Sequence, residues 1–156
     1  MIRNLWPTEI EVTSVTPPVT ILGQQATMLG SITKNIILGD VKARESEEYD
    51  FSYIFYIVAP ALNNYRYKLL TIYHNIDLYP VTVQVEESIY KEVPKRATGE
   101  RIPNSIFAIS EDEFTKALKA IFNSSKAKKV ISALLAQSTD NYKSPIIRQE
   151  NLDEET

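Results

Sequence analysis

Residues suited to acid–base chemistry are scarce in this chain. His74 is the single histidine among 156 residues and cysteine is absent, while Asp77 follows His74 by three positions. A histidine beside a carboxylate is the minimal part of a general base. No serine lies near them in a nucleophile-elbow context, and a lone histidine in a turn more often forms structural hydrogen bonds. The sequence therefore predicts no catalytic residue and favours a protein that is not an enzyme.

Metal or cofactor chemistry finds little support either. A site built mainly from histidine is excluded by the single His, and the lack of cysteine removes thiolate ligands and disulfides. Carboxylates cluster at Glu45, Glu47, Glu48 and Asp50, but without the spacing and glycine of a calcium loop. We interpret this cluster as a solvated turn, and we expect neither a metal nor a cofactor.

Nine tyrosines raise the question of base stacking on aromatic side chains. Tyr65 and Tyr67 alternate with Arg66 and Lys68, which places rings and cations on opposite faces of a strand. This pattern favours a buried aromatic layer and disfavours nucleic-acid binding. Other cations have no role in the expected core, and we predict that they form a binding surface for an acidic protein partner: Lys91, Lys95, Arg96, Arg101, Lys126, Lys128 and Lys129.

The net charge of −3 hides an uneven distribution. Residues 1–87 and 139–156 are acidic, and residues 88–138 are basic. We expect compensation within the fold, with an anionic partner as the alternative. Lys126, Lys128 and Lys129 open a helix, where the dipole disfavours cations. An anion should offset this cost, whether from the acidic tail, the turn at 45–50 or an external partner.

The first third of the chain predicts a strand, a helix and another strand. Alternation over Thr8 to Val15 indicates a short strand that ends at Pro17-Pro18. Apolar residues then recur at spacings of three and four from Thr20 to Thr33, as in an amphipathic helix. Its Gly23 and Gly30 suggest a close approach to another backbone, and mere tolerance is the alternative. A strand is expected from Asn35 to Arg44.

Three alternating runs between Asp50 and Glu86 predict an antiparallel meander. The runs are Phe51 to Ala59, Tyr65 to His74 and Tyr79 to Glu86. Asn63-Asn64 suits a tight turn with positive φ. Pro80 restricts the last run to an edge or to pairing from its second residue onward.

The rest of the chain predicts a loop, two helices and a tail. Ser88 to Ile109 has no clear period and is expected to be a long loop, the first place to look for activity. Ser110 and Glu113 form a capping box, with Ile109 and Phe114 at the positions of a hydrophobic staple. Two apolar stripes follow, separated at Asn123-Ser124-Ser125. Residues 139–156 are expected to be a flexible acidic tail after a single domain over 1–138.

These elements predict an α+β domain: an antiparallel sheet of about four or five strands, a crossing N-terminal helix and a C-terminal helical pair. The order strand, helix, four strands is similar in topology to hot-dog and cone-shaped ligand-binding folds, without a shared motif. No run approaches the length of about 18 apolar residues needed to span a membrane, so we expect a soluble, cytoplasmic protein.

Two classes of function remain open. The first is a non-catalytic protein-interaction module, of the accessory, adaptor or immunity type, with possible self-association. The alternative is a small-ligand-binding or thioesterase-like domain with a pocket between helix and sheet, lined by Tyr53, Tyr56, Tyr67, Tyr73 and His74. An enclosed pocket with convergent polar groups would favour the alternative.

Overall fold

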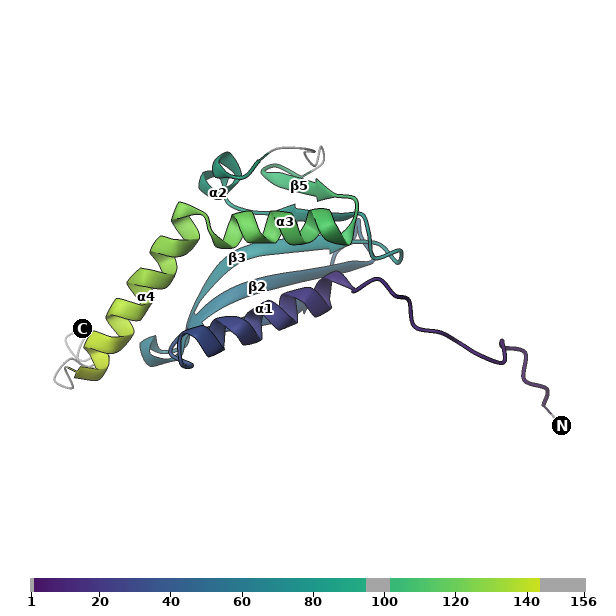
Figure 1. Ribbon diagram of the computed structural model, residues 1–156, viewed down its shortest axis with the longest axis horizontal. Helices are drawn as coiled ribbons and strands as arrows, with labels where there is room; N and C mark the ends of the chain where they lie inside the picture. The colour runs from purple at the N-terminus through teal and green to yellow at the C-terminus, as the bar shows by residue number, and fades with distance from the viewer. Residues whose placement is uncertain (1, 95–101, 144–156) are drawn as a thin grey trace.

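The chain folds into an antiparallel five-stranded meander with helices on one face (Figure 1). A computed structural model gives this structure, and it describes residues 2–94 and 102–143. The strands lie in the order β1-β2-β3-β4-β5. Their bounds are β1 Leu38–Arg44, β2 Phe51–Ala59, β3 Tyr65–His74, β4 Val81–Gln84 and β5 Ser105–Ala108. The α+β class and the meander predicted from the alternation are confirmed.

The helices are α1 Pro18–Ile32, the 3-10 turn η1 Pro60–Leu62, α2 Glu87–Glu92, α3 Glu111–Phe122 and α4 Ser125–Lys143. Three of the helices, α1, α3 and α4, begin close to the positions that the apolar stripes predict, whereas η1 and α2 were not predicted. α1 and α3 lie across the same face of the sheet, and α4 leaves the end of α3 at an angle (Figure 1). α4 continues through Lys143, past residue 139. Within residues 2–94 and 102–143, no helix combines the length and apolarity of a membrane span.

The hydrophobic core lies between the helices and the sheet. Cross-strand partners such as Phe55 with Leu70 and Ile72 with Val83 point toward the helices, and all four are almost fully buried. Leu22, Phe114 and Ile121 meet them from α1 and α3. Because directly opposed residues share a face of the sheet, the register of each strand is set by this apolar layer.

The opposite face of the sheet carries polar and aromatic residues. Arg66 on β3 lies 2.6 Å from the Asp40 carboxylate on β1, and its guanidinium lies 4.4 Å from the ring centroid of Tyr56 on β2. One arginine thus spans three strands by an ion pair and a cation–π contact. Since these groups are partly open to solvent, the contribution to stability is about 1 kcal/mol or less.

Local turn chemistry follows the sequence. Asn63 and Asn64 have φ of 58° and 56°, which confirms the predicted turn. β4 begins at Val81, directly after Pro80, and pairs with β3 on one side and β5 on the other. Of the two alternatives for Pro80, pairing from the second residue onward is therefore correct.

The prediction of a long loop from Ser88 to Ile109 is wrong over most of its described part. α2 covers residues 87–92 and β5 covers residues 105–108. Ile89 and Val93 are buried against the core, and Ile106 and Ala108 extend the sheet beside β4. Elements of six and four residues are too short to leave a clear period. Residues 95–101, which contain Lys95, Arg96 and Arg101, lie outside the described residues.

The predicted strand over Thr8 to Val15 is also not formed. This segment is extended without a partner strand, and Ile10 and Val12 are 77% and 94% exposed. Alternation supplies the side-chain pattern of a strand, but the backbone must also find hydrogen-bond partners. Without this strand, the order that resembled the hot-dog and cone-shaped folds is not present.

Candidate functional site

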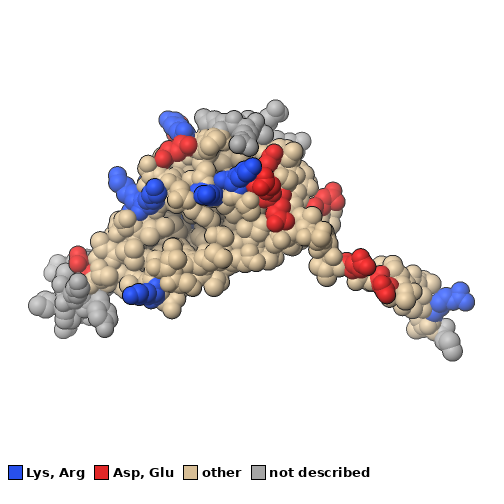
Figure 2. Space-filling view, in the orientation of Figure 1, with Lys and Arg blue, Asp and Glu red and all other residues tan. Residues whose placement is uncertain are grey.

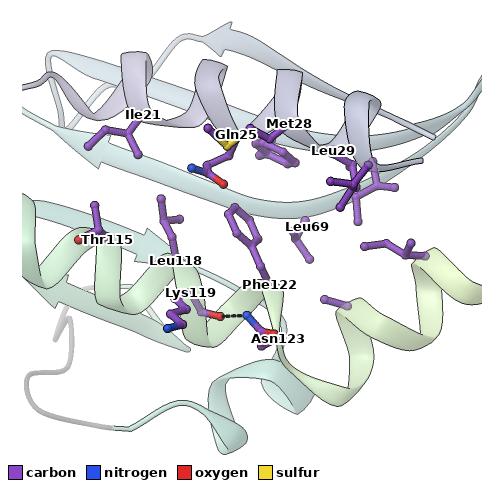
Figure 3. Close-up of a pocket in the computed structure, with 15 residues that line it drawn as sticks. Ile21, Gln25, Met28, Leu29, Leu69, Thr115, Leu118, Lys119, Phe122 and Asn123 are labelled. Atoms are coloured by element: carbon purple, nitrogen blue, oxygen red, sulfur yellow. Dashed lines mark hydrogen bonds between the residues drawn. The ribbon is translucent and has the colours of Figure 1, made fainter. Parts of the chain in front are cut away.

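An apolar groove lies between α1 and α3 (Figure 3). It encloses about 490 Å³. β2 and β3 form its floor, and the start of α4 closes one end. Five elements supply the lining: Ile21, Gln25, Met28, Leu29 and Ile32 from α1; Phe55 and Ile57 from β2; Leu69 from β3; Thr115, Leu118, Lys119 and Phe122 from α3, followed by Asn123; and Ala127 and Ile131 from α4.

α1 forms one wall because Gly39 lets it lie directly on the sheet. A Cβ atom placed on Gly39 would lie 2.5 Å from the Cα of Ala26 and 3.0 Å from Cζ of Phe55. The close approach predicted for α1 therefore occurs, but the glycine that permits it belongs to β1. Gly23 has open space around it, and Gly30 has the Oδ1 of Asn35 at 3.2 Å from such a Cβ.

α3 forms the other wall, and its start is fixed by the predicted cap. The Ser110 hydroxyl accepts a hydrogen bond from the Glu113 N–H at 3.2 Å. The Glu113 carboxylate accepts from the Ile109 N–H at 3.0 Å, one residue earlier than in a standard capping box. Ile109 is 61% exposed while Phe114 is fully buried, so the staple positions add little burial.

The mouth of the groove exposes apolar side chains to solvent. Met28 is 54% exposed and Ile32 is 79% exposed. Deeper inside, the Phe55 and Phe122 rings pack with their centroids 5.6 Å apart. Most of the polar groups lie on the α3 side, where the Asn123 amide donates to the Lys119 carbonyl at 2.8 Å, and Gln25 extends from α1 (Figure 3). The groove thus combines an apolar interior with a narrow polar rim that contains one cation.

This lining is mostly apolar and offers few polar groups. Its polar members are two amides, a hydroxyl and the ammonium of Lys119. The Thr115 hydroxyl donates to the Asp112 carbonyl at 2.9 Å, and the lining contains neither a histidine nor a carboxylate that could act as its base. Pockets of several hundred Å³ with this kind of lining bind ligands by burial, and the few polar groups orient them.

Carboxylates from the fold contact the start of α4. The Glu92 carboxylate accepts hydrogen bonds from the Ser125 N–H at 3.0 Å and from the Ser125 hydroxyl at 2.9 Å. Lys126 lies 3.8 Å from Glu86. Neither of these carboxylates was among the anions that the sequence suggested, and the tail after Lys143 lies outside the described residues. The flank of α2 supplies both carboxylates, which supports internal compensation at this point.

The remaining predicted cations divide into paired and unpaired ones. Lys91 lies 3.4 Å from Glu87 on α2. Lys128 and Lys129 are exposed, and no ion pair within the described ranges involves either of them. Figure 2 shows basic side chains over the region of α3 and the start of α4, with acidic ones near the start of α3. Among its described members the predicted surface is therefore divided, and the unpaired ones lie on α4.

Glu86 is held as a carboxylate by its neighbours. Burial alone would raise its pKa, but hydrogen bonds from Ser88 and Tyr67 and the nearby charge of Lys126 outweigh this, so the net pKa is lowered. Burial, and then the Glu86 carboxylate, raise the pKa of Tyr67. The Tyr67 phenol therefore stays protonated and donates to Glu86. This hydrogen bond connects β3 to Glu86, the residue before α2.

The tyrosines predicted to line a pocket do not face one space. The register places Tyr53, Tyr67 and His74 on the helix face and Tyr56 and Tyr73 on the opposite face. None of the five belongs to the lining of the groove. A space between helix and sheet exists as the alternative hypothesis expected, but other residues line it. Tyr53 and Tyr56 are separated by the alternation along β2, and a register shift between Phe55 and Tyr56 separates Tyr67 from Tyr73 on β3.

His74 is enclosed by aromatic rings. It is 3% exposed, and its ring centroid lies 5.3 Å from that of Phe51 and 6.2 Å from that of Tyr53. Nδ1 lies 2.7 Å from the Asn75 carbonyl, which assigns the proton to Nδ1. Asp77 is exposed. These contacts are typical of a structural histidine.

The groove itself was not predicted. Met28, Leu29 and Ile32 belong to the apolar spacing that predicts α1, and nothing in that spacing shows which end of the apolar side stays open. The chain matches no protein-family model, no curated protein and no solved structure. Within residues 2–94 and 102–143, no cluster of three or more potential metal-binding side chains occurs.

Proposed function

We propose that this protein is a non-catalytic binding module that holds an apolar segment of an acidic protein partner in the groove between α1 and α3. The observation that carries the proposal is the open apolar mouth, where Met28 and Ile32 remain largely exposed. Exposed apolar surface that lines a concavity is favourable only when another molecule covers it. Methionine suits such a surface because its flexible, polarisable side chain adapts to different partners.

The charge around the groove supports an acidic flank on the partner. Lys119 is the charged residue of the lining, and Lys128 and Lys129 are exposed on α4, whose Ala127 and Ile131 line the groove. An amphipathic helix with apolar residues on one side and carboxylates beside them would match both features. The charges would speed association and favour acidic over basic partners.

Direct binding to defined peptides tests the proposal. Two labelled amphipathic peptides with the same apolar face, one acidic and one basic on the polar face, are titrated by fluorescence anisotropy. We expect the acidic peptide to bind more tightly, and its affinity to fall as salt screens the lysines. Equal affinities, or binding of neither peptide, would contradict the proposal.

A matched pair of variants localises the binding. Met28→Asp places a charge in the mouth, whereas Gln24→Asp places the same charge on an exposed α1 position outside the lining. About half of the methionine surface is left to bury, worth about 1–1.5 kcal/mol, so Met28→Asp should weaken binding about tenfold. Gln24→Asp should have little effect. Equal losses from both variants would show that the groove is not the site.

A second candidate ligand is a small amphiphile with one anionic group. The volume of about 490 Å³ lies within the range of small-molecule pockets, and Lys119 could pair with a carboxylate at the rim. Titration with dodecanoate separates the two ligands. Saturable dodecanoate binding that depends on Met28, without peptide binding, would favour the ligand-binding alternative.

A further inference from the structure

Residues 2–15, here called the N-terminal arm, expose an unusual amount of apolar surface. Figure 1 shows the arm leaving α1 and running away from the domain. Five of its large apolar side chains are at least 77% exposed: Ile2, Leu5, Trp6, Ile10 and Val12. Scattered apolar residues are normal on a surface, but a continuous exposed run indicates an interaction site.

The arm carries the pattern of a strand that lacks a partner. Ile10 and Val12 alternate with Glu9, Glu11 and Thr13, so an extended backbone puts two apolar residues on one side and two carboxylates on the other. Such a segment pairs where a sheet edge offers free backbone groups and an apolar layer on one face. The arm has the pattern of a strand but no partner strand, and both observations are explained if the sheet edge that it pairs with belongs to another molecule.

β1 offers such an edge. It is the outermost strand beside β2 and runs over seven residues, whereas the opposite edge strand β5 has four. Val41 and Ala43 share the helix face with Phe55 and Tyr53, to which they are directly opposed. Lys42 and Arg44 lie on the other face and are exposed. The edge therefore presents apolar residues on one face and cations on the other.

We propose that the N-terminal arm of one molecule adds as an antiparallel strand to β1 of a second copy, and that two copies exchange arms. One antiparallel register matches every feature: Val12 opposite Val41, Ile10 opposite Ala43, Glu11 opposite Lys42 and Glu9 opposite Arg44. Both apolar residues then extend the helix-face layer, and both carboxylates meet cations.

Alternative pairings fit less well. A shift by one residue would bring Ile10 and Val12 beside the cations and the carboxylates onto the apolar face. A parallel arrangement that matches both charge pairs would place Val12 beside Glu45, beyond the end of β1. The antiparallel register is thus selected by side-chain chemistry at four successive positions.

The base of the arm directs it to a second molecule. The Thr16 N–H donates to Glu111 at 2.9 Å, and the Tyr79 hydroxyl donates to the Thr16 carbonyl at 2.9 Å. These bonds hold Thr16 beside α3 and near Tyr79, two residues before β4, which lies three strands from β1. A strand added outside β1 would lie four strand spacings from β4, about 19 Å, whereas the four residues from Val12 to Thr16 span at most about 14 Å. The arm cannot reach this register on its own β1 while Thr16 stays bound.

Cysteine cross-linking tests the register, because the natural chain has no cysteine. Two single variants of the full chain, Val12→Cys and Val41→Cys, are mixed under mild oxidation. Opposed residues of antiparallel strands have Cα atoms about 5 Å apart, which suits a disulfide. We expect a mixed disulfide dimer, identified by mass spectrometry, in several-fold excess over the control pair Thr13→Cys and Val41→Cys. Equal yields from both pairs, or no mixed dimer, would overturn the proposal.

Charge exchange tests the interface without a covalent bond. Glu9→Lys with Glu11→Lys, or Lys42→Glu with Arg44→Glu, should each weaken self-association about tenfold or more in sedimentation experiments. The variant with all four changes should associate like the natural chain. All substituted positions are exposed, and circular dichroism checks the fold. A natural chain that stays monomeric at every attainable concentration would also overturn the proposal. The inference rests on other residues than the groove, because none of its variants changes a residue of the groove lining.

Discussion

Gly39→Ala should destabilise the protein, although alanine is usually the better residue in a folded chain. The new Cβ would lie 2.5 Å from the Cα of Ala26 and 2.7 Å from its Cβ. Carbon atoms in contact prefer about 3.5–4.0 Å, so the overlap amounts to about 1 Å. Because the obstacle is the α1 backbone, no single side chain can rotate away to relieve it.

The expected loss is about 1–3 kcal/mol, the usual cost of overpacking, and the upper part of this range applies because α1 must move as a unit. Urea unfolding followed by circular dichroism measures the change in unfolding free energy. The matched control is Gly23→Ala in α1, where an added Cβ meets nothing within 4 Å. That substitution should stabilise the protein by about 0.5–1 kcal/mol, since alanine favours helix.

The two substitutions are chemically identical and should have opposite signs. An unchanged or increased stability of Gly39→Ala would show that α1 does not rest on β1 as described. A loss at Gly23 would refute the assignment of open space around that residue.

Three further predictions concern side chains at the ends of the helices. Ser110→Ala should lower the free energy of unfolding, measured with urea, by about 1 kcal/mol, because the Glu113 N–H loses its hydrogen bond to the Ser110 hydroxyl. An unchanged midpoint would indicate that α3 begins elsewhere. Glu92→Gln should speed amide hydrogen exchange in the first turn of α4, because the Glu92 carboxylate caps the Ser125 N–H. Unchanged exchange would show that Glu92 does not stabilise this turn. Folding lowers the Glu86 pKa, so its contribution is present above the ordinary carboxyl pKa of about 4.3 and is lost as pH falls through the folded value. The stability advantage of the natural chain over Glu86→Gln should therefore shrink between about pH 7 and pH 3, and a constant difference would contradict the pKa shift.

The sequence predicted those elements whose information is local. The alternation from Phe51 to His74, the Asn63-Asn64 turn and the Ser110 cap each depend on neighbouring residues, and each is found in the structure. α2 and β5 were missed because they are short and are stabilised by distant contacts, such as Ile106 beside Val83. The N-terminal arm shows the opposite error. Its alternation predicted a strand, but an alternating pattern does not show whether a partner strand lies beside it.

The candidate site was less predictable because it depends on distances between elements. The groove exists where α1 and α3 stand apart, and the residues along their facing sides have the same composition as a buried stripe. The predicted tyrosine pocket combined residues from both faces of the sheet, which a strict use of strand parity would have excluded. The carboxylates that serve Lys126 and Ser125 come from about 40 and 33 residues earlier in the chain, beyond the reach of local patterns.

The contact at Gly39 joins two parts of the molecule that would otherwise respond separately. β1 carries the free edge, and α1 is a wall of the groove, and at Gly39 no space remains between them. A strand added to that edge would alter the twist of β1, and α1 would have to follow it. Occupancy of the edge and occupancy of the groove would then be thermodynamically coupled, and the coupling would be equal in both directions. A substitution at Gly39 would therefore be enough to change the coupling between the β1 edge and the groove.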